Sequence, residues 1–302
     1  MRMVDAVSIL STPLIADALA RLFSRVVNPS PKPGVQFPDI AGRTTEADIP
    51  TRHGDTAATI YHPVGEPAGV YVNIHGGGFV VGHREQDDPW CRFLAARAGV
   101  TVVNTDYLLA PDCRFPTPVE QLYDVVSWAA AQEAGDRLCV GGQSAGGNLS
   151  AAVSRMALTH GGPPIALQVL HYAPLDLVTA TGRKRSPLGG KAIMKPWMGE
   201  VFDTAYIPDQ KRRRDPLASP AWGDNADEIA GIARALVITC EYDRLRDEAA
   251  AYAKNLDAVG ALADYVEVPA VDHGYNIMSD ATEVTRGMYE LIAGQVRQAV
   301  NR

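Results

Sequence analysis

A serine between small residues is the strongest chemical signal in the sequence. Residues 142–147 read Gly-Gln-Ser-Ala-Gly-Gly, so Ser144 stands in a G-x-S-x-G motif. An apolar run near 137–141 precedes the motif, and a helical pattern near 145–160 follows it. In that context the serine lies on a tight strand-to-helix turn, where flanking side chains would collide and the hydroxyl is exposed for attack. We therefore predict that Ser144 is a nucleophile.

A serine nucleophile needs a base, and three histidines follow it in the chain. In this type of site the chain order is serine, acid, histidine. His160 falls at the end of the helix that begins at the serine, four turns away. His171 directly follows a predicted strand. His273 lies in a loop after the last predicted strand, from which it can reach back over the sheet, so we predict His273 as the base and keep His171 as the second choice.

The base needs an orienting carboxylate, for which three residues compete. Asp243 lies in the loop after the apolar strand near 235–240. Asp247 comes four residues later, where a helix begins and its dipole stabilises an acid that has no catalytic role. Asp272 is adjacent to His273 and would have to fold back on its neighbour. Geometry favours Asp243, with Asp247 and Asp272 as alternatives.

A glycine run upstream can supply the donors that an attacking serine requires. Residues 75–79 read His-Gly-Gly-Gly-Phe directly after the apolar run near 70–74. Attack on a carbonyl creates an oxyanion, and each N–H group aimed at that charge is worth about 10²–10³ in rate. We predict an oxyanion hole made by the backbone amides of Gly76, Gly77 and Ala145.

The elements around these residues alternate in type from about residue 44 onward. Strand patterns lie near 57–62, 70–74, 100–104, 137–141, 166–170, 235–240 and 264–268, and helical patterns near 117–133, 145–160, 246–259 and 282–299. Such alternation predicts a mostly parallel α/β sheet flanked by helices. An amphipathic helix begins at Thr12-Pro13 and ends before a proline-rich connector. We predict one domain over residues 1–302.

The alternating pattern breaks between about 180 and 220, where Gly, Pro and basic residues mix with apolar ones and no strand pattern occurs. We interpret this stretch as an insertion over the carboxyl ends of the strands, with a helix that completes the core as the alternative. The predicted cap elements are therefore about 1–45 and 180–220. Phe79, Gln143, Trp197 and Phe202 are the candidate substrate-binding residues, although large aromatic side chains commonly belong to the core.

Composition excludes several classes of function. The net charge is −7, and the basic run at 211–214 is short and followed by Asp-Pro, so it predicts a solvated loop rather than a nucleic-acid site. The four cysteines are far apart, which favours buried thiols over a metal or redox motif. Residues 1–8 do not resemble a signal peptide, and no run approaches the roughly 18 apolar residues of a membrane span. We expect a cytoplasmic protein without metal or cofactor.

Together these motifs resemble the hormone-sensitive-lipase-like family of α/β-hydrolase esterases. The matching segments are His75-Gly-Gly-Gly-Phe79, Asp106-Tyr-Leu-Leu-Ala-Pro-Asp112, Phe115-Pro116, Gly142-Gln-Ser-Ala-Gly-Gly147, Asp215-Pro216 with Ser219-Pro220, Asp243-Arg-Leu-Arg-Asp-Glu248 and His273-Gly274. The resemblance implies an α/β-hydrolase fold with a helical cap, and it carries the nucleophile, acid and base to Ser144, Asp243 and His273. It carries the oxyanion donors to Gly76, Gly77 and Ala145. Gln143 and Leu108 depart from the residues that are usual in the family, which bears on the substrate pocket and not on the triad.

The function predicted is hydrolysis of short to medium acyl carboxylic esters through a Ser-His-Asp triad and an acyl-enzyme. The same triad could instead act on an amide, formamide, carbamate or lactone, because the acyl-enzyme chemistry is shared. A ligand-binding protein that kept the fold and lost the chemistry is a further alternative, which the intact triad residues disfavour. The expected partner is a small-molecule ester, and a homodimer is a candidate assembly.

Overall fold

The computed structural model describes residues 9–40 and 42–302. Residues 1–8, on which the absence of a signal peptide was argued, lie outside the described residues. The strands are β1 (Arg43–Ile49), β2 (Thr56–His62), β3 (Val70–Ile74), β4 (Thr101–Thr105), β5 (Leu138–Gln143), β6 (Ile165–His171), β7 (Ala235–Cys240) and β8 (Leu262–Val268). The helices are α1 (Pro13–Val26), α2 (Asp88–Ala98), α3 (Thr117–Ala130), α4 (Ala145–His160), α5 (Pro196–Tyr206), α6 (Arg246–Ala258), α7 (Tyr275–Met278) and α8 (Thr282–Val300).

These strands form one eight-stranded sheet in the order β1-β2-β4-β3-β5-β6-β7-β8. All neighbours from β4 to β8 are parallel, and β2 is antiparallel to both β1 and β4. The chain passes from β3 to β4 on one side and later to β5 on the other side. In an open α/β sheet such a reversal leaves a crevice at the carboxyl ends of the strands, and a ligand site is expected there. The predicted α/β-hydrolase fold is confirmed.

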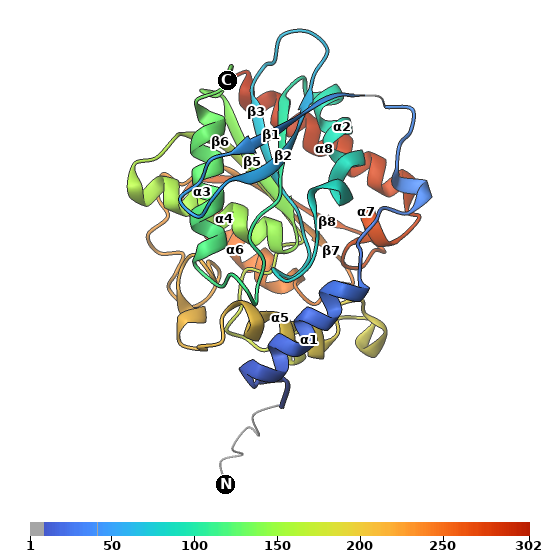
Figure 1. The fold of residues 1–302 in the computed structure, drawn as a ribbon, viewed down its shortest axis with the longest axis vertical. Helices are drawn as coiled ribbons and strands as arrows, with labels where there is room; N and C mark the ends of the chain where they lie inside the picture. Colours follow the sequence, from blue (N-terminus) through green and yellow to red (C-terminus); the bar gives the residue numbers. More distant parts are fainter. Residues whose placement is uncertain (1–8, 41) are drawn as a thin grey trace.

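Helices cover both faces of the sheet (Figure 1). On one face α2 and α8 pack against each other and belong to an apolar core that includes Leu236 and Ile238 of β7. On the other face α6 packs against Ala235 and Val237 of the same strand, and α3 and α4 continue that layer. Side chains that alternate along one strand therefore reach two separate apolar cores, as a strand buried on both faces requires.

α1 and α5 lie together beyond the carboxyl ends of the strands, although about 170 residues separate them in the chain (Figure 1). α1 begins with Pro13 and buries Ala16 and Ala20, and the ring of Phe23 meets that of Phe202 edge-on at 5.2 Å between centroids. The stretch 180–220 thus contains a helix, α5, and no strand. Cap limits of about 1–45 and 180–220 remain a prediction.

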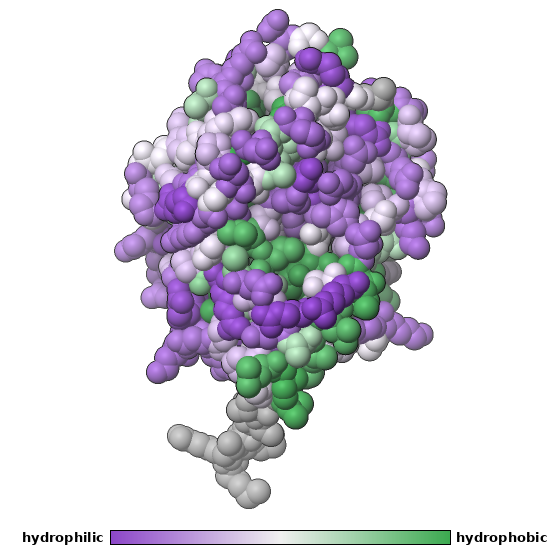
Figure 2. Space-filling model, viewed as in Figure 1, coloured by the Kyte–Doolittle hydropathy of each residue, from purple (hydrophilic) through white to green (hydrophobic). Residues whose placement is uncertain are grey.

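The space-filling view shows an otherwise largely polar face, with apolar residues gathered over the region where α1 lies (Figure 2). Three residues on the outer side of α1 account for part of this surface, with exposed fractions of 82% at Leu14, 56% at Leu22 and 71% at Val26. None of the helices described is both long and apolar enough to cross a membrane.

Several elements of the body were not anticipated from the sequence, among them β1, α2 and the one-turn helix α7. β1 is an edge strand in which Ile49 alone is buried, so it carries no alternation of apolar and polar residues. α2 has eleven residues and buries apolar side chains around most of its circumference, which hides the helical period. Its ends did carry a signal, namely Pro89 in the first turn and Gly99 in the left-handed conformation after the last turn.

The cysteines and the basic run differ in how they match expectation. All four cysteines were predicted to be buried thiols; three of them are buried free thiols, whereas Cys113 is a half-buried one. The basic run is not a simple solvated loop, because Arg213 is buried. Its guanidinium donates to the carbonyl of Ile207 and to the hydroxyl of Thr204. That arginine ties the end of α5 to the segment that follows it.

Candidate active site

Ser144 lies on the turn between β5 and α4, with φ 52° and ψ −120°. A residue other than glycine rarely adopts a positive φ, and the strain is typical of a nucleophile held above a sheet. The flanking glycines are required by close backbone approach. A Cβ atom at Gly142 or Gly146 would lie 2.2 or 1.9 Å from the carbonyl oxygen of Ile74. The sequence signal at this turn therefore has a direct steric cause.

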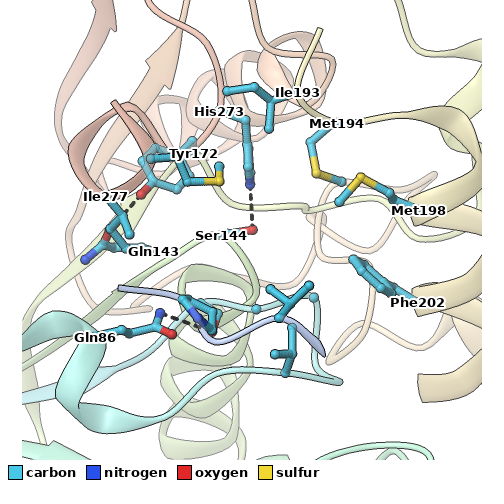
Figure 3. A pocket seen from close by; sticks show the side chains of 18 of the residues that line it. Gln86, Gln143, Ser144, Tyr172, Ile193, Met194, Met198, Phe202, His273 and Ile277 are labelled. Carbon is cyan, nitrogen blue, oxygen red and sulfur yellow. Dashed lines mark hydrogen bonds between the residues drawn. The ribbon is translucent and has the colours of Figure 1, made fainter. Parts of the chain in front are cut away.

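The side chains of Ser144, His273 and Asp243 lie in a line of two hydrogen bonds. Oγ of Ser144 is 2.9 Å from Nε2 of His273, as the dashed line in Figure 3 marks. Nδ1 of His273 is 2.7 Å from Oδ2 of Asp243, whose other oxygen accepts the amide of Leu245. The loops after β5, β7 and β8 supply the three side chains, and these strands end at the same edge of the sheet.

The charge of the buried carboxylate controls the imidazole. Burial lowers the pKa of His273. The charge and the hydrogen bond of Asp243, with a smaller contribution from Asp272, raise the pKa by more than burial lowers it. The net result is a pKa of His273 above the ordinary value of 6.5. A raised pKa makes the neutral imidazole a stronger base, provided that the pH is high enough to keep it neutral.

The other candidate bases lie elsewhere. Nε2 of His171 is 3.1 Å from the hydroxyl of Tyr275, and burial lowers the pKa of His171 to about 3, so this imidazole is neutral. His160 lies at the end of α4, with Nδ1 2.9 Å from the carbonyl of Met156. The backbone amide of Ser144 donates to the carbonyl of His171 at 2.9 Å, but within the described part of the chain neither imidazole is hydrogen-bonded to the hydroxyl of Ser144.

The other candidate acids also have different partners. Asp247 lies on α6 and forms an ion pair with Arg246 at 2.9 Å. Asp272 accepts the amide of Ile193 and the amide of His273, each at 2.7 Å. Asp272 therefore holds the loop of the histidine to the segment before α5, without a hydrogen bond to the imidazole.

The glycine run lies beside the serine. Gly77 and Gly78 have φ 131° and 60°, and a Cβ atom at Gly77 would lie 1.7 Å from the carbonyl oxygen of Val81. Within residues 9–40 and 42–302, the amides of Gly76, Gly77, Gly78 and Ala145 donate to no protein acceptor. Gly78 is thus a further candidate donor that was not predicted from the sequence, although the third glycine of the run was the available signal.

His75 supports this loop and is not free to react. It is buried, its Nδ1 is 2.8 Å from the carbonyl of Gly76, and its ring stacks on Tyr107 with 4.3 Å between centroids. Burial lowers the pKa of His75 to about 4, so it remains neutral at physiological pH.

Gln143, predicted to contact substrate, is held in a buried polar network behind the nucleophile. Its Oε1 accepts from the hydroxyl of Tyr172 and from Nδ2 of Asn276, each at 2.6 Å, and its Nε2 donates to Asp87 at 3.2 Å. Burial raises the pKa of Asp87 to about 7, although hydrogen bonds from Asn73 and Gln86 lower it. The residue beside the nucleophile is thus fixed from three directions.

A cavity of about 150 Å³ opens above Ser144 and His273 (Figure 3). Its walls are mostly apolar and come from α1, the segment before α5, α5 itself and α7. They include Phe23, Val27, Ile193, Met194, Met198, Phe202 and Ile277. Gln143 also lines it. The contribution of α1 was not predicted residue by residue, although its amphipathic stripe was visible in the sequence.

Two of the predicted substrate-binding aromatics lie outside this cavity. Phe79 is buried, stacks on Tyr206 with 4.0 Å between ring centroids and lines a smaller cavity beside Ser144. Trp197 is 43% exposed, touches the ring of Phe23 edge-on and lines neither cavity. Across the described residues, no group of three His, Cys, Asp or Glu side chains is arranged to hold a metal ion.

Comparison with known proteins gives a consistent result. A family profile described as the alpha/beta hydrolase fold matches residues 71–277. The chain is 35% identical over 269 residues to the carboxylic ester hydrolase LipN of Mycobacterium tuberculosis, covering 85% of this chain and 70% of the relative. It is 32% identical over 263 residues to an ethyl acetate hydrolase of Pseudomonas putida, covering 81% of each chain.

Solved structures agree. The hyperthermophilic esterase of the archaeon Pyrobaculum calidifontis superposes with a TM-score of 0.79 at 32% identity, over 95% of this chain and 90% of that one. The thermophilic carboxylesterase EstE1, cloned from a metagenomic library, gives a TM-score of 0.77 at 30% identity, over 97% and 99%.

Proposed function

The chain belongs to the hormone-sensitive-lipase-like family of α/β hydrolases and is a carboxylic ester hydrolase, and from this premise we propose that Ser144, His273 and Asp243 form its catalytic triad. The observation that carries the proposal is the pair of hydrogen bonds, 2.9 Å from Ser144 to His273 and 2.7 Å from His273 to Asp243. The strained turn at the serine supports the same assignment.

Acylation follows from this geometry. Nε2 of His273 takes the proton of Ser144 as Oγ bonds to the ester carbonyl carbon, and the carbonyl oxygen becomes an oxyanion. Asp243 holds the proton on Nδ1 and stabilises the imidazolium. When the tetrahedral intermediate collapses, His273 gives its proton to the leaving alcohol, and the acyl group remains on Ser144.

Deacylation repeats the sequence with water. His273 takes a proton from the attacking water, and Ser144 leaves with that proton when the second intermediate collapses. The oxyanion of both steps lies against the amides of Gly76, Gly77 and Ala145, for which the described chain provides no acceptor. Gly78 lines the same cavity and its amide is likewise without an acceptor there, so it can share this role. Side chains and water account for every proton, so the proposal requires no metal or organic cofactor.

The substrate range is proposed from the cavity above the serine. A mostly apolar space of about 150 Å³ suits a short to medium hydrocarbon group. Two phenylalanines and two methionines, whose side chains are flexible, line it, namely Phe23, Phe202, Met194 and Met198. The relative named ethyl acetate hydrolase supports small esters as substrates. We infer a preference for esters whose larger apolar part fills this cavity.

The test is hydrolysis of p-nitrophenyl esters from acetate to palmitate by wild type and by Ser144→Ala. Loss of the nucleophile lowers kcat by about 10⁶. Ser154→Ala is the matched control, because Ser154 is a buried serine on α4 whose hydroxyl has no hydrogen-bond partner in the described chain.

The outcomes separate the alternatives. Activity of wild type and Ser154→Ala with an inactive, folded Ser144→Ala supports the triad, and the profile of acyl chain length reports the space that the acyl group enters. A Ser144→Ala variant that remains active rules out this serine as the nucleophile. If wild type cleaves none of the esters, the same assay with amides, carbamates and lactones decides between another acyl substrate and a binding role.

A further inference from the structure

A second, smaller cavity is lined by Ser144 and by residues of α5. Its volume is about 30 Å³, which by this measure holds two or three water-sized groups at roughly 10–15 Å³ each. Ser144, Gly78, Met194 and Phe202 line both cavities, so the two spaces meet at the serine. Figure 3 shows Phe202 and Met194 reaching towards Ser144 from the side of α5.

Part of the lining of the smaller cavity is polar. It is formed by Asp203 of α5 and by Thr181, the first residue of the short 3-10 helix η4 (Thr181–Arg183). Gly199 lies one turn before Asp203 on the same face of α5, and a Cβ atom there would be 1.9 Å from Oγ1 of Thr181. The threonine hydroxyl is therefore packed directly against the helix face that carries the carboxylate.

Both polar groups lack a protein partner. Asp203 is 8% exposed and Thr181 is 3% exposed, and within residues 9–40 and 42–302 no hydrogen bond reaches the carboxylate of Asp203 or the hydroxyl of Thr181. Buried polar side chains are normally hydrogen-bonded, because burial without a partner costs free energy. Two such groups in the wall of one cavity that also contains the nucleophile point to a ligand group that completes them.

The neighbouring charges restrict what that group can be. Lys184 also lines the cavity, and its Nζ already has two partners, Glu248 at 2.5 Å and the carbonyl of Asp176. The positive charges of Lys184 and Arg213 act on Asp203 and disfavour binding of a cationic ligand group there. The carboxylate itself disfavours an anion. A neutral hydroxyl fits both groups, because it can donate to Asp203 and accept from Thr181.

Chemistry decides which part of the ester enters this space. The leaving alcohol must receive its proton from His273, and His273 lines the larger cavity and not the smaller one. The alcohol therefore lies in the larger cavity, and the acyl group extends from Ser144 into the smaller one. We propose, on the basis of the proposed function, that the smaller cavity binds the acyl part of a short hydroxyacyl ester. The hydroxyl of that acyl group lies between Asp203 and Thr181.

The state of the carboxylate at assay pH agrees with an acceptor role. Burial raises the pKa of Asp203 to about 6, against the lowering effect of Arg213 and Lys184. At pH 8 the side chain is ionised and can only accept hydrogen bonds, so a substrate hydroxyl must act as the donor towards it.

The first test needs only wild type. Hydrolysis is followed at constant pH 8 for hexyl lactate against hexyl propionate and for hexyl 3-hydroxybutyrate against hexyl butyrate, with each hydroxy ester as separate enantiomers. For each ester, kcat/KM is divided by the rate constant for hydrolysis of the same ester by hydroxide. We expect this corrected value of one hydroxy ester to exceed that of its parent by about tenfold or more. The 3-methoxybutyrate ester, which lacks the donor, should lose this preference.

The second test measures the same ratio of kcat/KM in variants. Thr181→Val should lower the ratio by about two- to tenfold, and Asp203→Leu by tenfold or more, because the hydrogen bond it removes involves a charged group. Thr204→Val is the matched control, since Thr204 is a buried α5 residue whose hydroxyl accepts from Arg213 and which does not line the cavity. The control should retain the wild-type ratio.

The results distinguish failure of this proposal from failure of the proposed function. If hexyl butyrate is cleaved and neither hydroxy ester is preferred, the hydroxyl subsite is wrong and the ester reaction stands; the two polar groups then bind only water. A wild-type preference that persists in both Thr181→Val and Asp203→Leu also overturns the subsite. If none of the parent esters is cleaved, the proposed function itself fails.

Discussion

The proposed triad depends on one carboxylate that works through a neighbour. Asp243 is 1% exposed and contacts the base, not the substrate. Its charge is the principal reason that the pKa of His273 lies above 6.5 despite burial of the ring, which by itself would lower it. A residue of this kind acts by orienting and charging the imidazole, so its effect should be visible in the pH dependence of catalysis.

We predict an acid limb of kcat/KM with a midpoint above 6.5. The imidazole must be neutral to accept the serine proton, so activity rises with pH as His273 loses its proton, and the raised pKa moves that rise to higher pH. Asp243→Asn should lower kcat by about 10⁴ and move the residual limb to lower pH. The measurement is kcat/KM for p-nitrophenyl butyrate from pH 5 to 9. A limb that does not move in the variant would contradict the assignment of Asp243.

A second prediction concerns Asp87, the buried acid behind Gln143. Burial raises its pKa from 3.8 to about 7, so the folded chain binds a proton that the unfolded chain releases. The unfolding free energy therefore falls as pH rises from about 4 to about 7 by up to about 4 kcal/mol, and it stays lower above that window. Asp87→Asn should remove this dependence.

The measurement is urea unfolding of wild type and Asp87→Asn from pH 4 to 8. The stability of the variant relative to wild type should rise across that window, whatever the constant cost of the altered hydrogen bond to Gln143. A difference that does not change with pH would show that Asp87 keeps an ordinary pKa in the folded protein.

At the scale of elements, the strand-to-helix turn at Ser144 is the feature with the least freedom. α4 begins at Ala145 immediately after the strained serine, and the helix approaches the end of β3 closely at Gly146. The atoms in the way are backbone carbonyls of Ile74 and His75, which cannot move without displacing the glycine run of the oxyanion loop. Nucleophile and oxyanion donors are thus positioned by one contact between two elements.

Gly146→Ala should disrupt this contact. The added Cβ atom would lie 1.9 Å from the carbonyl oxygen of Ile74 and 2.7 Å from that of His75, so we expect a loss of about 2 kcal/mol or more and at least a hundredfold loss of kcat/KM. The control is Gly287→Ala on α8, where nothing lies within 4 Å and the change should stabilise the protein by about 0.5–1 kcal/mol. Thermal unfolding and esterase assays compare the two, and equal effects would contradict the steric argument.

At the scale of the whole molecule, Arg244 connects the body of the hydrolase to the segment that precedes α5. It follows Asp243 in the chain, and its guanidinium donates to three carbonyls, those of Lys184, Gly189 and Met194, at 2.7, 2.7 and 2.9 Å. Met194 in turn lines both cavities. One side chain next to the acid therefore holds the covering segment in place.

Arg244→Lys should loosen this segment without removing the charge. An ammonium group cannot span three carbonyls in the way that a planar guanidinium does, so we expect about a tenfold rise in KM for p-nitrophenyl butyrate and a melting temperature lower by about 2–4 °C. Arg97→Lys is the control, because Arg97 forms an exposed pair with Glu290 on the far helices and should change either value little. A normal KM in Arg244→Lys would mean that the segment holds its position without this contact.

The sequence by itself determined the features whose signals are local. The G-x-S-x-G turn, the glycine run and the apolar strands before Ser144 and Asp243 appear as residue types at fixed spacing, because steric limits and burial act on neighbouring residues. The fold class and the family follow from those signals. β1 and α2 were not predicted, because an exposed edge strand and a helix buried on most sides do not show a simple apolar period.

Only the tertiary structure decided which distant groups meet. The partners of Gln143 come from positions 87, 172 and 276, and Phe23 of α1 reaches Phe202 of α5 across most of the chain. Whether Asp203 and Thr181 are paired or left open to a cavity depends on how α5 packs against η4. Spacing along the chain carries no information on such contacts, because long-range packing, and not local steric preference, sets the distance between them.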